Sequence, residues 1–255
     1  PETDSLLGIW NDVSQSDGVR FKAAKKACSD HHYIELYPEK AVELVNEMLK
    51  VAKKNNKKNA EANCYMYLGI SYSILGMVEK SIESHNKCLV ISTEQGDKKR
   101  ISNSLNNIAI LYKNYGNFNE AINYANRSLD ICTDNKDTLG AIVATGTLGN
   151  AYRSKGDNKS ALKYFRQYLG GSKRINHYPG IAKGYLNISN VFADENQIDS
   201  TEIYLKYSLA VSEEHGLISD IIRAQVNYAD LFLKKGEYSK AKGMAMNILD
   251  RAEKS

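Results

Sequence analysis

Asparagine side chains recur at multiples of 40 residues along the chain, and their chemistry suits a peptide ligand. Asn107, Asn187 and Asn227 share one position of this spacing, and Asn150 and Asn190 share another. An asparagine side chain offers two donors and an acceptor, which match the C=O and N–H of a peptide group. Asparagine is also a poor helix former, so its repetition in register calls for a reason. We predict a ladder that holds an extended peptide backbone; the alternative is that these residues are merely tolerated on a solvated helix face.

Basic side chains repeat beside the asparagines. Guanidinium and ammonium groups there would recognise an acidic side chain or a terminal carboxylate of the ligand. The predicted partner is therefore a protein or an extended peptide with acidic character. The complete predicted binding set is Asn103, Asn106, Asn107, Lys113, Asn150, Arg153, Lys183, Asn187, Asn190, Arg223, Asn227 and Asp230.

The elements that carry these residues repeat with the same period. Every fortieth residue from Gly69 is small, and every fortieth from Tyr72 is aromatic. The series from Gly76 contains only glycine and asparagine, the series from Ser81 only small residues, and the series from Leu89 only leucine. Five columns that agree without an insertion identify an internal repeat, which is typical of solenoids and arrays.

Each column has a physical task in a pair of antiparallel helices. The small residues let the two helices approach closely, and the aromatic residue packs against them on one face. The column from Gly76 closes the first helix in a left-handed conformation, and Asn117 and Asp157 start the turn into the second. The leucine column packs the far end of the second helix. The pattern predicts an all-α fold of stacked helical hairpins.

The repeat resembles the tetratricopeptide repeat, as in Tyr67-Leu68-Gly69 followed by Tyr72, Gly76 and Ser81. The common form has a closing proline, and this chain has Thr, Lys or Glu there. The 40-residue variety is similar to the repeats of kinesin light chains and Pins-type polarity adaptors, which bind extended peptides. The resemblance covers residues 61–255. It implies a right-handed α-solenoid whose first helices line a concave binding face, where asparagines hold the ligand backbone.

The predicted organisation has three parts. Residues 1–20 form an N-terminal cap, with Ser16-Asp17 as a helix N-cap. Residues 21–60 form a degenerate first unit, in which Ser29 and His32 occupy the small and aromatic places, Leu36 replaces the turn glycine, and Pro38 opens the second helix. Five units follow at 61–100, 101–140, 141–180, 181–220 and 221–255. No cap is expected at the C-terminal end.

The N-terminal segment Asp4–Asp12, with Ser16-Asp17, Arg20 and Ala23, resembles the start of bacterial receptors in which tetratricopeptide repeats precede a membrane helix and a cyclase or histidine-kinase output domain. This resemblance implies a sensory input domain on the periplasmic side, with dimerisation coupling it to the output. The alternative is a freestanding peptide-binding adaptor, which would be cytoplasmic.

Other chemistry finds little support in the residues. The histidines at 31, 32, 85, 177 and 215 lie in different units without a catalytic partner, so we expect no enzyme. The four cysteines lack metal-ligand spacing, which predicts buried thiols and no metal or cofactor. Asn107 fits one place of the carboxylate clamp that binds chaperone tails, but Asn63, Met66 and Ile70 do not supply the rest.

Two further features leave alternatives open. Lysine runs at 53–58 and 98–100 could bind nucleic acid or an anionic membrane, but no aromatic residues interleave with them, so a solvated loop edge is favoured and no nucleic acid is predicted. Gly170-Gly171 interrupts a second helix and predicts either a hinge or a static kink. No run of 18 apolar residues is present in this chain, so no membrane segment is predicted.

Overall fold

The computed structural model describes residues 2–29 and 31–253, without the side chains of residues 31, 32 and 250–253, and all regular structure in these ranges is helical. The chain divides into two compact units, unit 1 ending at Asp137 and unit 2 beginning at Thr138. Successive helices pack in pairs within each unit. The predicted all-α class of stacked helical hairpins is therefore confirmed.

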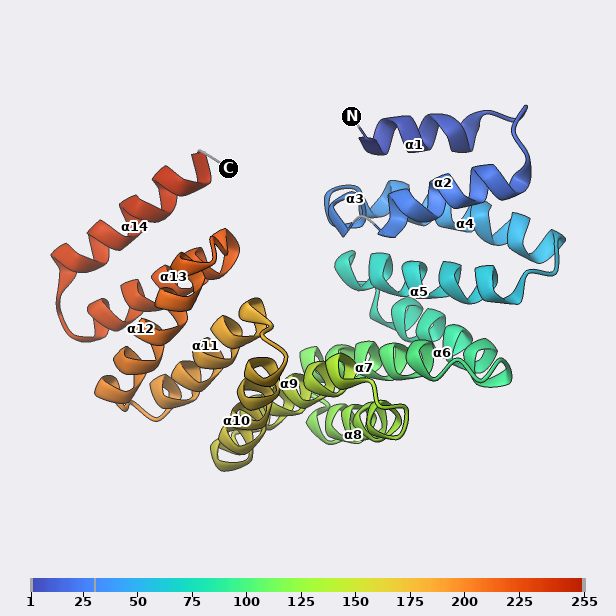
Figure 1. Ribbon diagram of the computed structural model, residues 1–255. Coiled ribbons are helices and arrows are strands. Elements are labelled where there is room, and N and C mark those ends of the chain that lie inside the picture. The colour runs from blue at the N-terminus through green and yellow to red at the C-terminus, as the bar shows by residue number, and fades with distance from the viewer. Residues whose placement is uncertain (1, 30, 254–255) are drawn as a thin grey trace. The chain divides into compact units, whose positions relative to one another are not determined.

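Unit 1 holds the first eight helices (Figure 1). They are α1 (Glu2–Asn11), α2 (Asp17–Ser29), α3 (His31–Leu36), α4 (Pro38–Lys54), α5 (Lys58–Ile74), α6 (Val78–Glu94), α7 (Lys98–Asn114) and α8 (Phe118–Asp134). From α4 onward each helix packs against the next. Pro38 is the first residue of α4, as predicted, because its missing N–H is not needed there.

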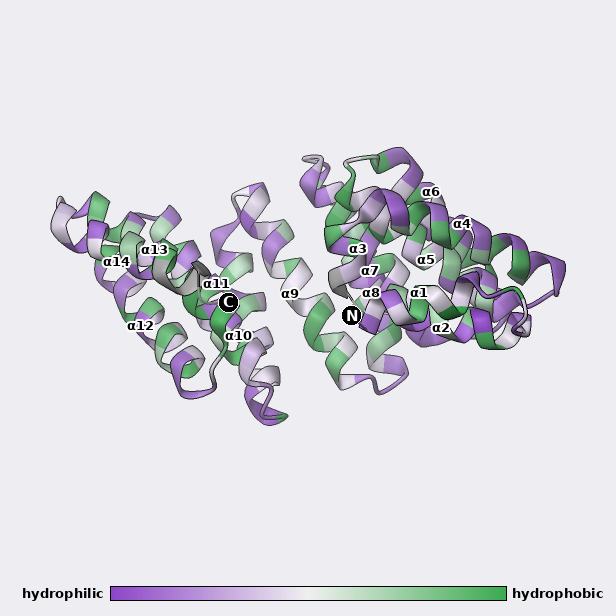
Figure 2. Ribbon diagram, turned by 90° about the horizontal axis from the view of Figure 1, so that it is seen from above, coloured by the Kyte–Doolittle hydropathy of each residue, from purple (hydrophilic) through white to green (hydrophobic). Residues whose placement is uncertain are grey.

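Unit 2 continues the same scheme. Its helices are α9 (Thr138–Lys155), α10 (Asn158–Arg174), α11 (Tyr178–Asp194), α12 (Ile198–Glu214), α13 (Ile218–Lys234) and α14 (Tyr238–Glu253). First helices also contact the next first helix, since α11 packs against α13. Figure 2 shows hydrophobic and hydrophilic segments alternating along the helices, because each helix has one buried face and one wet face.

The small-residue columns let the two helices of a hairpin come into close contact. A Cβ atom on Gly69 would lie 2.6 Å from two atoms of the His85 ring, and one on Gly149 would lie 2.5 Å from Cε1 of Phe165. The Ser81 hydroxyl also donates to the Gly69 carbonyl at 2.6 Å. A large side chain on the second helix thus fills the space that glycine leaves on the first, and the predicted role of these columns is confirmed.

The aromatic column forms a stack between the helices of each central hairpin. Its ring lies against a tyrosine twelve residues later, with centroids 5.3–5.4 Å apart, in the pairs Tyr112–Tyr124, Tyr152–Tyr164 and Phe192–Tyr204. Where the later position holds no ring, a lysine covers the first ring instead. Lys80 lies 5.6 Å from Tyr72 and Lys240 lies 5.5 Å from Phe232. The column therefore keeps one ring face covered in every hairpin.

The turns repeat at half the expected period. Every twentieth residue from Asn56 to Gly236 has a positive φ, which includes the predicted column from Gly76. At each of these turns the N–H of the next residue bonds the carbonyl five residues back, as from Met77 to Tyr72 at 2.8 Å and from Asp97 to Ser92 at 2.9 Å. This is the Schellman motif, which satisfies a carbonyl at the end of the helix. Both turns of a hairpin therefore use one backbone geometry.

Lys136 is the turn residue least suited to its backbone conformation, with a φ of 57°. Side chains other than glycine and asparagine pay roughly 1–2 kcal/mol in the left-handed region, while glycine costs more entropy on folding. We expect Lys136→Gly to raise the free energy of unfolding by about 0.5–1 kcal/mol. Urea denaturation would measure it. Gly96→Ala places a side chain at an equivalent turn with a φ of 66° and should lower the free energy of unfolding. An increase in both variants would contradict this account.

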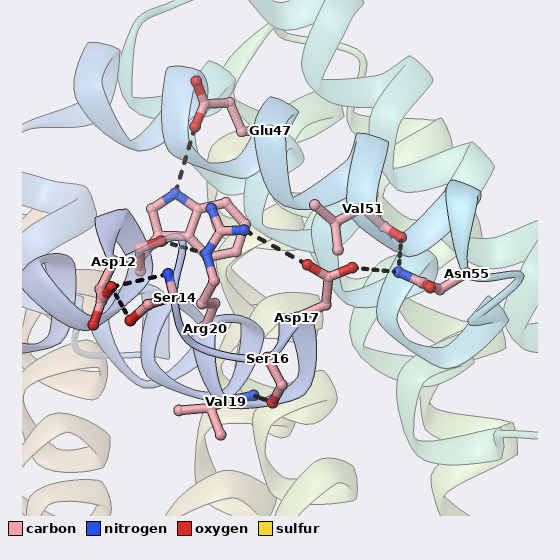
Figure 3. Close-up of polar contacts among 10 residues, drawn as sticks. Asp12, Ser14, Ser16, Asp17, Val19, Arg20, Glu47, Val51 and Asn55 are labelled. Carbon is pink, nitrogen blue, oxygen red and sulfur yellow. Dashed lines mark hydrogen bonds and ion pairs between the residues drawn. The ribbon is translucent and has the colours of Figure 1, made fainter.

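The N-terminal helices are tied to α4 through one polar cluster (Figure 3). Trp10 is buried, its indole N–H donates to the Glu47 carboxylate at 3.4 Å, and the Arg20 guanidinium lies 4.9 Å from its ring. Arg20 Nε also donates to the Trp10 carbonyl at 2.7 Å. Asp17 accepts from Asn55 at the end of α4 at 3.1 Å. We interpret α1 with α2 as the terminal cap.

Several expectations at the ends of helices differ in detail. Ser16 accepts from the Val19 N–H at 3.4 Å, which confirms it as the N-cap of α2. However, α2 continues through residue 20, the predicted boundary of the cap, and ends at Ser29. The side chain of His32 lies outside the described residues. Leu249 of the leucine column is 64% exposed because it lies on α14, which no further described helix covers.

The glycine pair in α10 does not interrupt the helix, contrary to the prediction. α10 is continuous from Asn158 to Arg174, with Gly170 exposed and Gly171 buried. A Cβ atom on Gly171 would lie 2.8 Å from Cγ1 of Ile142, so the second glycine makes room for a large side chain on α9. Close packing, rather than a break in the helix, accounts for this residue.

The cysteines and the hydropathy of the helices agree with the sequence. All four thiols are buried and free, as predicted. Burial raises the pKa of Cys28 and Cys64 to about 12, so both are protonated at neutral pH. Among the described helices, none combines the length and the apolar character that crossing a bilayer requires.

Candidate functional site

Unit 2 brings several predicted binding residues to one groove of about 540 Å³, which we call the asparagine groove. Its polar lining includes Arg153 from α9, Asn190 and Asp194 from α11, Thr201 from α12, and Asn227, Asp230 and Lys234 from α13. Ile198, Leu231 and Leu233 supply apolar lining. A small number of polar groups that converge on a partly apolar pocket is typical of a binding site.

Two asparagines of neighbouring first helices form the centre of the polar lining. Nδ2 of Asn227 donates to Oδ1 of Asn190 at 2.5 Å, and both side chains are half-buried. The bond uses one donor of Asn227 and one lone pair of Asn190. The NH₂ group of Asn190 and the carbonyl oxygen of Asn227 keep hydrogen-bonding capacity, so the pair presents both a donor and an acceptor. That is the complement of a peptide group.

Arg153 already has a carboxylate partner, which the sequence reasoning did not foresee. Its Nε donates to Oδ2 of Asp194 at 2.6 Å, and its Nη2 donates to Oδ1 at 2.9 Å. This bidentate pair joins α9 to α11. Both side chains are partly exposed, so the pair contributes only roughly 0–1 kcal/mol to the stability of the fold. Arg153 would have to leave Asp194 before it could recognise an acidic ligand.

The other charges of the groove also fail to make it basic. Asp230 is exposed, and no hydrogen bond or ion pair joins it to another described residue. Lys234 donates to the Ala193 carbonyl at 3.4 Å. The groove therefore presents carboxylates as well as cations. Its chemistry suits the recognition of a peptide backbone better than the selection of an acidic ligand.

Asn106 does not lie on the predicted surface. Its side chain is only 8% exposed, and its Oδ1 atom has no hydrogen-bond partner among the described residues. The equivalent residue of unit 2, Gly146, faces the ring of Tyr168 on the second helix of its hairpin. This position therefore points into the hairpin, and Asn106 is removed from the surface set for that reason.

The remaining predicted residues lie on first helices outside the asparagine groove. In unit 1, Asn103 is exposed on α7, and Asn107 and Lys113 are half-buried. In unit 2, Asn150 and Asn187 are half-buried, while Lys183 and Arg223 are exposed. Arg223 donates to Asp220 at 3.4 Å. A binding role for these residues stays a prediction.

Sequence reasoning missed the apolar lining and Asp194. Asp194 lies on the face already considered for binding, five residues after Ser189 of the small column, so its position was a usable signal. Leu233 is 51% exposed at the position that holds Arg153 two units earlier. No three histidine, cysteine, aspartate or glutamate side chains gather as a metal site would require in the part of the chain that the structure describes.

A family model described as the tetratricopeptide repeat matches residues 61–134 and 100–174, which together extend from the first turn of α5 to the end of α10. The Schellman turns and small-residue contacts follow the same period through the matched segments. Residues 61–174 of the chain therefore consist of tetratricopeptide repeats. No curated protein matches its sequence.

Three solved structures are similar to this chain and support its fold as a helical solenoid of this kind. The apo form of RapI has a TM-score of 0.74 and 18% identity, over 99% of this chain and 89% of that one. A Rap protein complexed with Competence and Sporulation Factor has a TM-score of 0.68 and 14% identity, over 99% and 75%. The apo quorum sensor NprR from B. thuringiensis has a TM-score of 0.68 and 15% identity, over 100% and 76%.

Proposed function

We propose that this protein is a non-catalytic adaptor that binds an extended peptide segment of a partner in the asparagine groove. Tetratricopeptide repeats are protein-interaction modules, and the family match supports that role. The observation that carries the finer proposal is the Asn190–Asn227 pair, which keeps a free donor and a free acceptor in the groove. A backbone amide placed there would pair with both side chains.

The comparisons support the adaptor more than a receptor input domain. The similar structures include a Rap protein in complex with a factor, and they extend over nearly the whole of this chain. The resemblance of residues 4–23 to bacterial receptors has no counterpart among these findings. Side-chain specificity would come from Ile198, Leu231 and Leu233, which suit an apolar side chain next to the anchored backbone.

Asn227→Ala is expected to weaken peptide binding about tenfold, because an unpaired buried amide costs roughly 1–3 kcal/mol. Peptides selected on the whole chain from a random display library would be titrated by fluorescence anisotropy. Asn190→Ala should weaken the binding of the same peptides by a similar factor.

Asn123→Ala is the matched control, since Asn123 is exposed on the second helix α8. The control should bind as the wild type does. Equal affinity of wild type and Asn227→Ala for every selected peptide would refute binding through this groove.

A further inference from the structure

Unit 1 carries a concentration of positive charge that the asparagine groove does not explain. Lys53 and Lys54 end α4, Lys57 lies in the turn that follows, and Lys58 begins α5, while α7 begins with Lys98-Lys99-Arg100. Both turns join the second helix of one hairpin to the first helix of the next. We call this surface the lysine edge.

The two turns are neighbours in space. Nη1 of Arg100 donates to Oδ1 of Asn59 at 3.4 Å, which joins the start of α7 to the start of α5. In Figure 1 both turns lie on the same side of unit 1. Stacking of the hairpins thus places two separate lysine runs on the same side of unit 1.

Part of this charge is already compensated inside the protein. Lys58 pairs with Glu61 at 3.2 Å, and Arg100 pairs with Asp97 at 3.1 Å. Lys53 lies 5.6 Å from the Tyr65 ring. Four exposed lysines remain without an acidic partner among the described residues, namely Lys54, Lys57, Lys98 and Lys99.

The repeat itself does not require these lysines. The equivalent first turns of α9, α11 and α13 read Thr138-Leu139-Gly140, Tyr178-Pro179-Gly180 and Ile218-Ser219-Asp220, without a basic residue. Cations at a helix N-terminus also oppose the helix dipole, so Lys57, Lys98 and Lys99 stand where carboxylates would stabilise the fold. An anionic partner would relieve both this opposition and the repulsion between the lysines.

We propose that the lysine edge is a second interaction surface, which binds an acidic segment of a partner protein. A protein partner is favoured because these repeats are protein-interaction modules. No exposed aromatic ring lies in either turn on which a nucleic-acid base could stack, since Tyr65 is buried. The turns also hold Asn55, Asn56, Gln95 and Gly96, which provide no apolar side chain to enter a bilayer. The lysine edge, rather than the asparagine groove, would then recognise the acidic character predicted for the partner.

The experiment compares three polyanions on the whole chain: fluorescein-labelled polyglutamate, a mixed-sequence DNA duplex, and vesicles of phosphatidylserine with phosphatidylcholine. Polyglutamate should bind, and its affinity should fall as added salt screens the charges. Replacing Lys54, Lys57, Lys98 and Lys99 by glutamate should reduce its affinity by at least about tenfold.

The matched control makes the same charge change at exposed residues of unit 2, namely Lys159, Arg166, Lys206 and Lys242. This control should keep most of the affinity for polyglutamate. Asn227→Ala, which alters the asparagine groove and leaves the lysine edge intact, should also keep it. Circular dichroism and urea midpoints would confirm that the variants fold. The proposal is overturned if both charge variants lose binding equally, or if DNA or vesicles bind more tightly than polyglutamate.

Discussion

Phe165→Ala should lower the free energy of unfolding by about 3–5 kcal/mol, the range for removing a buried aromatic ring. Phe165 is fully buried in α10, and its ring occupies the space beside Gly149 of α9. Alanine would leave a cavity between the two helices, because the adjacent glycine has no side chain to fill it. Urea denaturation followed by circular dichroism would measure the loss.

The companion variants test whether the two positions act as a pair. Gly149→Ala should destabilise by about 1–3 kcal/mol through overpacking, partly offset by roughly 1 kcal/mol of helix propensity. The double variant recreates the Ala109–Ala125 pair found one hairpin earlier, where both alanines are fully buried. It should therefore be no less stable than Phe165→Ala alone. Strictly additive losses would show that the two sites are independent.

Acidification should destabilise unit 1 through His85, by about 2 kcal/mol between pH 7 and pH 5. His85 is buried on α6 against Gly69, and its Nδ1 has no hydrogen-bond partner among the described residues. Burial lowers the pKa of His85 from 6.5 to about 4. Between these values the unfolded chain binds the proton and the folded chain does not. Stability contributed by the neutral imidazole is therefore lost as the pH falls below about 6.5.

His85→Phe should remove this pH dependence without disturbing the fold. Phenylalanine already occupies the equivalent position opposite glycine in the Gly149–Phe165 pair, so the space accepts that ring. The control is His215→Phe, which removes an exposed imidazole and should leave the slope as in the wild type. Urea midpoints between pH 7 and pH 5 would be compared. An unchanged slope in His85→Phe would assign the acid sensitivity to other groups.

The repeat could be predicted from the sequence because close packing and tight turns restrict which residue types can occupy its positions. A Cβ atom cannot be accommodated at Gly69 or Gly149, and the turn at Gly76 requires a positive φ. Such local demands leave a periodic record that a single sequence shows. The same reasoning placed Pro38 at the start of α4 and the four cysteines in the interior.

The second turn column left a similar but interrupted pattern. Its residues are Asn56, Gly96, Lys136, Asn176 and Gly216, all with positive φ. The Schellman bonds hold the backbone there whatever the side chain, at a modest cost for Lys136. Four of these five residues are glycine or asparagine, as in the first column, so the signal was present in the sequence and was overlooked; Lys136 alone departs from it.

The sequence by itself determined the hairpins, their period and the helix face that carries most of the predicted binding residues, because these follow from spacing along one helix. Only the tertiary structure decided which of those residues meet. The Arg153–Asp194 pair spans 41 positions, the Asn190–Asn227 pair spans 37, and the burial of Asn106 depends on the helix packed over it. Such contacts depend on the rotation and offset of one hairpin against the next, which local spacing does not specify.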